Sequence, residues 1–306
     1  MDASIIIRTY NEARWLGEAL EGVAAQAGGL TGGQTRGLTW ETLLVDSGST
    51  DGTVEIARAH GCRIETIDKA DFTFGRSLNQ GCRAARGRVL VFLSGHCIPA
   101  APDWLERLCA PVLDGRVVYA YGRQIGRPGV SKFSEEMLFR KYYPPVSQIP
   151  QDGFFCNNAN AALLAETWAA HPFDETVTGL EDLLLGKALS AAGKAIGYVA
   201  EAPVVHLHEE SWPKVATRYE REAVAMQRIM PELQVGFFDF LRYTAAGAGL
   251  DWREAIASGR TKERGMAGLA LEILLFRLHQ YWGTYRGAND HRRLSRERKD
   301  RYYYPH

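Results

Sequence analysis

The strongest constraint on the fold is the apolar run at residues 89–93, Val-Leu-Val-Phe-Leu, which no polar residue interrupts. Such a run is typical of a strand buried on both faces, as in a parallel sheet. The run ends at Ser94-Gly95-His96, and Pro99 prevents simple continuation. Ligands of open α/β sheets bind just outside the carboxyl ends of the strands. His96 therefore lies where a site is expected, although an incidental histidine in a turn is the alternative.

Shorter apolar strands are expected at 4–7, 42–45, 63–67 and 117–122. Amphipathic helices are expected between and after them, at about 54–60, 78–86 and 100–112 and behind the first strand. Strands that alternate with helices indicate βαβ units and a parallel sheet, so the predicted class is α/β. Residues 28–37 are predicted to be a flexible loop, and 126–150 an irregular segment.

Composition excludes some classes of partner. The 306 residues carry 36 Lys and Arg against 36 Asp and Glu, so no overall basic charge favours nucleic acid. The five cysteines are odd in number and contain no CxxC pair, which favours reduced thiols in a cytosolic protein. No signal sequence and no run long enough to span a bilayer is visible. We expect a cytoplasmic protein.

Two carboxylates follow predicted strands on adjacent units, Glu12 and Asp46. A carboxylate at that edge can accept hydrogen bonds from a base or from a ribose hydroxyl. Asp51 has a structural alternative, since the segment around it is good turn chemistry and can cap the next helix. The segment matches neither the Walker A pattern nor Gly-x-Gly-x-x-Gly.

Several motifs together resemble a known family. Thr9-Tyr10-Asn11-Glu12, the segment 44–53 (Leu-Val-Asp-Ser-Gly-Ser-Thr-Asp-Gly-Thr) and Leu78-Asn79-Gln80-Gly81 are similar to the start of a family 2 glycosyltransferase of the GT-A fold. The resemblance covers about residues 3–210. It implies a Rossmann-like, mostly parallel sheet flanked by helices in a domain of residues 1–210, followed by a helical C-terminal extension of residues 211–306.

The resemblance implies that a nucleotide-sugar donor binds along the strand ends. Glu12 and Asp46 would hold base and ribose, with Asp51 near the base. The side-chain amides at 157, 158 and 160 would line the sugar pocket, since amides bind hydroxyls without adding charge, although asparagine-rich turn chemistry is the alternative. The donor-binding candidates are Thr9, Tyr10, Glu12, Asp46, Ser47, Asp51, Arg76, Asn79, Ser94, Gly95, Asn158 and Asn160.

Glu181 and Asp182 begin a predicted helix, and acidic residues favour a helix N-terminus for structural reasons alone. The resemblance implies that they are the catalytic pair, with Asp182 as the general base of an inverting transfer. Because a helix N-terminus lowers the pKa of an aspartate, we expect Asp182 to be ionised at neutral pH.

The register of the resemblance places Ser94-Gly95-His96 on the family's Asp-x-Asp metal motif, so an aspartate is lost. The family binds Mg²⁺ or Mn²⁺ there, and imidazole suits Mn²⁺ and later transition metals better than Mg²⁺. His206 and His208 are spaced to face one side of an extended segment. We predict that one or both meet His96 at one divalent cation. The alternatives are structural histidines and a site neutralised by cationic side chains.

Residues from 211 onward are expected to be mostly helical. The most apolar stretch, 266–278, carries Glu272 and Arg277. Residues 286–301 are locally basic, which is typical of a solvated helix face, with a surface that favours anionic lipid as the alternative. Aromatic residues beside arginines suit a membrane-surface helix. Packing against the rest of the chain or against another subunit is the alternative, so both peripheral membrane contact and a homo-oligomer stay open.

The expected activity is inverting transfer of a hexosyl or deoxyhexosyl group from a nucleotide-diphosphate sugar to a hydroxyl of a glycan or lipid-linked acceptor, in cell-surface polysaccharide biosynthesis. A donor-binding pseudoenzyme is one alternative, because Ser94 replaces an aspartate. A sugar-1-phosphate nucleotidyltransferase is another, but the segment after the first strand, residues 8–12, lacks the glycines that such an enzyme needs. The expected location is the cytoplasm, including the inner face of the membrane.

Overall fold

The computed structural model describes residues 1–28, 37–290 and 301–303. The chain divides into two compact units. The first unit comprises residues 1–125, 143–177 and 181–207. The second comprises 126–142, 178–180 and the chain from 208 onward. The sequence prediction divided the chain at 210 and placed the two short internal segments of the second unit in the first domain.

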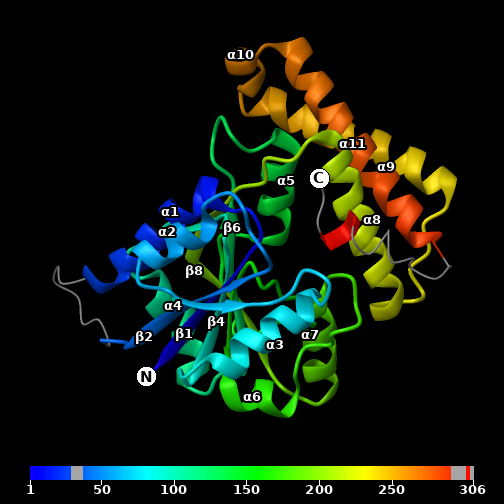
Figure 1. The fold of residues 1–306 in the computed structure, drawn as a ribbon. Helices are drawn as coiled ribbons and strands as arrows, with labels where there is room; N and C mark the ends of the chain where they lie inside the picture. Colours follow the sequence, from blue (N-terminus) through cyan, green and yellow to red (C-terminus); the bar gives the residue numbers. More distant parts are fainter. Residues whose placement is uncertain (29–36, 291–300, 304–306) are drawn as a thin grey trace. The chain divides into compact units, whose positions relative to one another are not determined.

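The first unit is built on a mixed sheet of eight strands in the described residues, in the order β3-β2-β1-β4-β7-β6-β8-β5. Figure 1 shows the sheet with helices packed around it. Strands β1 to β4 run parallel, as do β6 and β8, whereas β7 and β5 pair antiparallel to their neighbours. The strands are β1 (Ala3–Thr9), β2 (Trp40–Asp46), β3 (Arg63–Thr66), β4 (Val89–Ser94), β5 (Cys97–Pro99), β6 (Tyr119–Ile125), β7 (Asn160–Leu164) and β8 (Ile196–His206).

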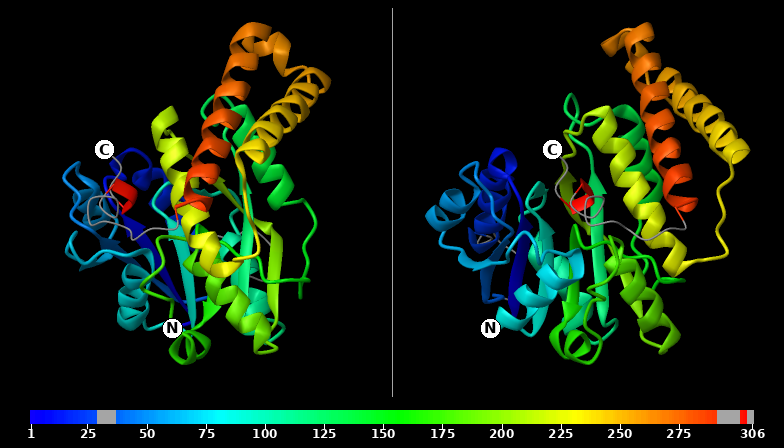
Figure 2. Two further views of the ribbon diagram at one scale, coloured as in Figure 1. Left: turned by 90° about the vertical axis from the view of Figure 1, so that its right-hand side faces the viewer. Right: turned by 45° about the vertical axis from the view of Figure 1, so that its right-hand side comes forward.

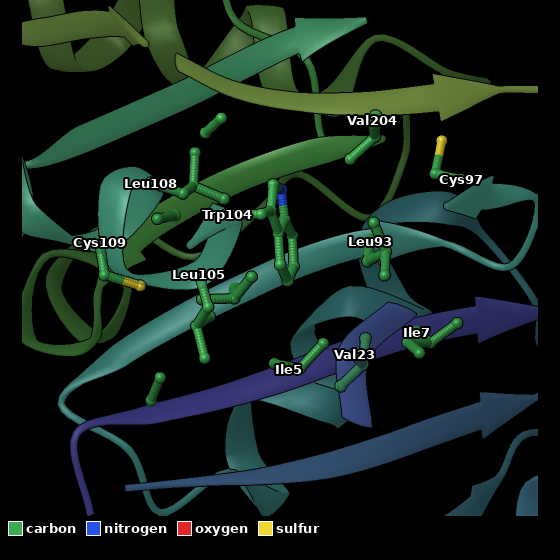
Figure 3. Packing of buried hydrophobic residues seen from close by; sticks show 14 of the residues in the cluster. Ile5, Ile7, Val23, Leu93, Cys97, Trp104, Leu105, Leu108, Cys109 and Val204 are labelled. Atoms are coloured by element: carbon green, nitrogen blue, oxygen red, sulfur yellow. The ribbon is translucent and has the colours of Figure 1, made fainter. Parts of the chain in front are cut away.

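Alternation along the strands assigns the two faces of the sheet. Ile5 and Ile7 face a buried core to which α1 and α4 contribute. Figure 3 shows Trp104 and Leu105 of α4 close to Ile5 and Leu93. On the other face, Gly81 of α3 approaches Ile6. The helices and the helical turn of this unit are α1 (Ala13–Ala24), η1 (Ala25–Gly28), α2 (Thr53–Ala59), α3 (Phe74–Ala84), α4 (Trp104–Leu113), α6 (Ala165–Ala170) and α7 (Glu181–Ala191).

The second unit is helical. In Figures 1 and 2, α11 lies between α8 and α9, and it contacts both. The helices are α5 (Phe133–Tyr142), α8 (Trp212–Ile229), α9 (Phe237–Ala257), α10 (Arg260–Arg264) and α11 (Met266–Ala288). None of the helices described for this protein combines the length and the hydropathy needed to cross a bilayer.

The structure adds a helix and a short strand to those expected from the sequence. The segment 126–150, predicted to be irregular, contains α5, because residues 133–142 include no proline: Pro128 precedes the helix and Pro144 follows it. The turn after β4 is followed by the short strand β5, which pairs with β8 despite Pro99. The predicted loop at 28–37 falls almost wholly outside the described residues, as does most of the basic stretch 286–301.

Candidate active site

The carboxyl ends of β1, β2 and β4 lie side by side. The register pairs Thr9 with Asp46 and Arg8 with Ser94. Because β1 lies between the other two strands, the polar residues that end all three strands meet at one edge of the sheet. This is the edge at which parallel sheets bind ligands.

Asp46 organises the loop that follows β2. Its Oδ1 accepts hydrogen bonds from Thr9 Oγ1 at 3.1 Å and Ser49 Oγ at 2.5 Å. Its Oδ2 accepts from the backbone N–H groups of Gly48 and Ser49, both at 2.9 Å. Ser47 completes the arrangement by donating its hydroxyl to the carbonyl of Thr9. The buried carboxylate thus has four internal donors, a role that the sequence prediction did not include.

Asp51 joins the starts of two helices. Its Oδ2 accepts from the backbone N–H of Ala13, and its Oδ1 accepts from the N–H and hydroxyl of Thr53. Partial burial alone would raise the pKa of Asp51, but these hydrogen bonds outweigh it and lower the pKa below its ordinary value. These contacts match the structural alternative for Asp51, in which its carboxylate caps the helix that follows.

His96 lies between two side chains of the first unit. Its Nδ1 is 3.0 Å from Glu12 Oε1, and its ring stacks on His206 with centroids 5.1 Å apart. A ligand nitrogen of His96 and one of His206 lie within 4.8 Å of each other. A Cβ at Gly95 would come 3.0 Å from Glu12 Cγ, so a side chain there would press on Glu12. His96 and His206 are therefore neighbours, and their predicted meeting at one cation stays a prediction.

Gln124 of β6 is a buried polar residue that the sequence prediction missed. Its Oε1 lies 2.6 Å from His206 Nδ1, and its Nε2 donates to Asn157 Oδ1 at 2.9 Å. The predicted strand at 117–122 ended before this residue, so nothing marked it as inward-facing. A polar side chain two residues beyond an apolar strand was the available signal.

His208 belongs to the second unit. Its Nδ1 is 2.8 Å from Oε1 of the buried Glu135, whose Oε1 also accepts from Arg218. Arg218 in turn donates to Glu210. His208 therefore has a carboxylate partner within its own unit, and its predicted role as a cation ligand stays a prediction.

Asp182 is the second residue of α7, which begins at Glu181, and it is buried. Its Oδ2 accepts from the backbone N–H of Asn158 at 2.8 Å, and its Oδ1 from the N–H of Leu183 at 2.7 Å. Burial and then the charge of Glu181 raise the pKa of Asp182 to about 7, against the opposing effect of these donors and Arg8. The expectation of full ionisation at neutral pH is therefore wrong: desolvation outweighs the helix N-terminus.

Glu181 contacts the sheet edge directly. Arg8 Nη1 lies 3.5 Å from Glu181 Oε1, and its guanidinium also lies over the ring of Phe74. Since Arg8 pairs with Ser94 in the sheet, the predicted catalytic pair reaches the end of β4. Ser94 N also donates to the carbonyl of Ala159, next to Asn158. Acids distant in sequence are thereby brought to one region of the first unit.

Several predicted donor-binding side chains have internal partners. Asn79 binds the backbone of Phe173 and the side chains of Trp168 and Glu175. Arg76 also binds Glu175, with Nε 3.0 Å from Oε2. Both side chains thus fix the segment before Val177, a structural role that the sequence prediction did not include.

The predicted sugar-pocket residues Asn158 and Asn160 also have partners within the protein. Asn160 is fully buried and binds Trp104 Nε1 and two backbone carbonyls, those of Arg123 and Ala202. Asn158 accepts the hydroxyl of Tyr119 on its side chain and gives its backbone N–H to Asp182. The hydroxyl of Tyr10, another predicted donor-binding residue, accepts a hydrogen bond from Lys69 Nζ at 2.9 Å.

The first unit has the GT-A fold, because solved glycosyltransferases share the architecture of its sheet. One is the mannosyltransferase PcManGT from Pyrobaculum calidifontis, in complex with GDP-Man and Mn²⁺. The two structures superpose with a TM-score of 0.61 and 17% sequence identity, and the match covers 95% of this chain and 88% of the mannosyltransferase. Another is glucosyl-3-phosphoglycerate synthase from Mycobacterium tuberculosis, in complex with Mn²⁺ and UDP-glucose. Its TM-score is 0.52 at 20% sequence identity, and the match covers 74% of this chain and 78% of the synthase.

Residues 4–166 match the model of glycosyl transferase family 2, and the chain belongs to that family. Glycosyltransferase AglE of Haloferax volcanii is 35% identical over 34% of this chain and 33% of its own length. The O-antigen chain rhamnosyltransferase WbaN of Salmonella anatum is 26% identical over 58% of this chain and 60% of its own length. The chain thus spans a third of the first relative and three fifths of the second.

Proposed function

We propose that this chain is an inverting glycosyltransferase that moves a hexosyl or deoxyhexosyl group from a nucleotide-diphosphate sugar to a hydroxyl of a glycan or lipid-linked acceptor. The observation that carries the proposal is the position of the Glu181–Asp182 pair, held against the sheet edge by Arg8 and the backbone of Asn158. Its relatives named as O-antigen rhamnosyltransferases support a cell-surface glycan as the product.

In this proposal Asp182 is the general base. Its carboxylate takes the proton of the acceptor hydroxyl as that oxygen attacks the anomeric carbon, and the bond to the diphosphate breaks on the opposite face. A pKa near the working pH suits a base, because the group is then both available and basic enough to accept a proton. Because the displacement is single, no nucleophilic carboxylate is needed.

The donor is proposed to bind along the strand ends in the domain of residues 1–210. Asp46 contributes by holding the loop 47–49 in place, and Thr9 fixes Asp46. The remaining proposed contacts are Tyr10, Glu12, Ser47, Asp51, Arg76, Asn79, Ser94, Gly95, Asn158 and Asn160, of which several also have the structural partners described above.

A divalent cation fits the residues present. His96 and His206 supply two imidazoles from adjacent rings, and we propose His208 as a third ligand because it is two residues from His206. Imidazole ligands favour Mn²⁺ over Mg²⁺. When bound, the cation would offset the charge of the leaving diphosphate.

Donor turnover tests the proposal. Nucleotide-sugars are first screened by thermal shift, because a ligand that binds the native state raises the melting temperature. The donor found is then assayed for transfer and hydrolysis, with and without Mn²⁺, using the wild type and Asp182→Asn. Turnover that Asp182→Asn abolishes supports the proposal. Donor binding without turnover under every condition would instead indicate a pseudoenzyme.

For the second unit we propose peripheral contact with a membrane, on the cytoplasmic side. The exposed positions of α11, all of whose residues are described, are apolar or glycine from 266 to 282. The two charged residues within this stretch have internal partners: Glu272 accepts from Phe133 N, and Arg277 is paired with Asp251. The large exposed apolar residues of α11 are Met266, Leu271, Leu274, Leu278 and Trp282.

Vesicle flotation distinguishes this contact from a homo-oligomer. We expect the wild type to float with vesicles of phosphatidylcholine and phosphatidylserine, and the variant L274E/L278E to remain in solution. Val146→Glu, at an exposed position in the first unit, is the control. If the double variant instead converts a dimer into a monomer in light scattering and wild type does not float, the face binds a second copy.

A further inference from the structure

The two stacked histidines of the first unit share one feature. Each directs its Nδ1 at a side-chain oxygen: His96 at Glu12 Oε1, 3.0 Å away, and His206 at Gln124 Oε1, 2.6 Å away. A carboxylate can only accept, so His96 must carry its proton on Nδ1 to make this bond. The tautomer of His206 depends on which way the amide of Gln124 points.

The hydrogen-bond network settles the orientation of that amide. The backbone N–H of Ala159 can only donate, and it lies 3.0 Å from Asn157 Oδ1. Asn157 therefore presents its oxygen, and this oxygen also receives the amide of Gln124 at 2.9 Å. Gln124 must use its nitrogen there and its oxygen toward His206. It follows that Nδ1 of His206 is the donor.

A neutral imidazole protonated on Nδ1 has its lone pair on Nε2. Histidines that bind metals have this arrangement, in which one ring N–H is held by a carboxylate or carbonyl oxygen while the other nitrogen binds the ion. We propose that Glu12 and Gln124 are positioning residues that hold His96 and His206 as Nδ1–H tautomers and so direct both Nε2 atoms to a divalent cation. This inference rests on the cation site of the proposed function, and it gives Glu12 a role other than base recognition.

The second unit repeats the pattern independently. His208 Nδ1 lies 2.8 Å from Oε1 of Glu135, which is held by Arg218 at 3.0 Å. Glu135 thus fixes the tautomer of His208 as Glu12 fixes that of His96. Loss of the family's metal-motif aspartate at Ser94 is offset in this chain by imidazoles whose basicity the oxygen partners increase. The donor set favours Mn²⁺ over Mg²⁺.

Two measurements on metal-free protein test the proposal without any donor sugar. Nitrogen-15 NMR of the histidine rings reports which nitrogen carries the proton. Titration with MnCl₂, followed by the electron paramagnetic resonance of free Mn²⁺, reports affinity. The variants are Glu12→Leu and Gln124→Leu, which remove an acceptor, and Glu12→Gln, which keeps an oxygen. Glu21→Leu, at an exposed position of α1, is the control for loss of an acid.

We expect the Nδ1–H tautomer at His96 and His206 in the wild type. Each leucine variant should shift its own histidine toward the Nε2–H tautomer and weaken Mn²⁺ binding about 10- to 100-fold. Glu12→Gln should restore most of the affinity, and Glu21→Leu should bind as the wild type does. Thermal melting identifies any variant that fails to fold, and the wild-type spectrum tests the tautomers even then.

Nε2–H tautomers in the wild type, or wild-type Mn²⁺ affinity in both leucine variants, would overturn the inference. Loss of donor binding in Glu12→Leu with Mn²⁺ affinity unchanged would also overturn it and leave Glu12 as a nucleotide contact. The proposed transfer activity fails separately, if the wild type binds Mn²⁺ as expected but turns over no nucleotide-sugar.

Discussion

The guanidinium of Arg8 lies 3.5 Å from the carboxylate of Glu181, and the two charges act in opposite directions on the neighbouring Asp182. The negative charge of Glu181 adds to burial in raising the pKa of Asp182, whereas Arg8 opposes the rise. Burial has the largest effect on the pKa of the proposed base, and a residue in the first strand and one at the start of α7 adjust it in opposite directions.

The first prediction concerns the pH dependence of transfer. Since the pKa of Asp182 is raised to about 7, the carboxyl group is progressively protonated below that pH. The rate at subsaturating substrate should fall about tenfold per pH unit on the acid side and level off above it. Asp182→Asn should lower kcat about 10²- to 10⁴-fold. A rate independent of pH between 5 and 8 would contradict the assignment.

The second prediction separates Arg8 from Glu181. Glu181→Gln removes the charge that raises the pKa of Asp182, so the acid limb of the pH profile should move to lower pH. Arg8→Met removes the charge that lowers this pKa, so the limb should move to higher pH. Profiles of kcat/KM for both variants provide the measurement. Shifts in the same direction would show that general damage to the site, rather than charge, is responsible.

The third prediction assigns Asn79 a structural role. Its amide makes four hydrogen bonds to the segment around Phe173, three of them to Phe173 and Trp168. Asn79→Ala should lower the free energy of unfolding in urea by about 3 kcal/mol, because buried backbone groups lose their partners. Gln80→Ala, which removes one exposed bond to Thr66, should cost much less.

The same Asn79 variant tests donor contact. A purely structural residue leaves the donor affinity of the folded protein unchanged, as thermal shift or calorimetry would show. A large loss of affinity with little loss of stability would restore Asn79 to the donor site.

The fourth prediction concerns two glycines of α11. A Cβ at Gly283 would lie 2.1 Å from the carbonyl oxygen of Ala216 in α8, so Gly283→Ala should destabilise the second unit by about 1–3 kcal/mol. Gly268 has no neighbour within 4 Å, and Gly268→Ala should stabilise the helix by about 0.5–1 kcal/mol. Urea unfolding of both variants checks the opposite signs.

Much of the sheet could be predicted from local patterns. The apolar run ending at Leu93 is a buried strand, and a helix does begin at Glu181, because both features depend on neighbours in the sequence. The histidine pair was also predictable, although only through the resemblance and not through spacing alone. The α5 helix was missed because the aromatic residues and prolines around it outweighed its weak periodicity.

The remaining features depend on contacts between distant residues. The sequence does not show that the side chain of Gln124 contacts His206, or that the amide of Asn79 hydrogen-bonds the backbone of Phe173. The pKa of Asp182 was predicted in the wrong direction, because the helix N-terminus is a local feature whereas burial is set by the whole fold. Side-chain partners and desolvation are properties of the folded chain.

The consecutive residues Asn157 and Asn158 contact two different parts of the candidate site. The side chain of Asn157 orients Gln124 beside His206, and the backbone of Asn158 holds Asp182. Because no residue separates Asn157 from Asn158, a residue inserted between them would move the Gln124–His206 pair and Asp182 relative to each other. A single peptide bond therefore couples the surroundings of His206 to those of Asp182.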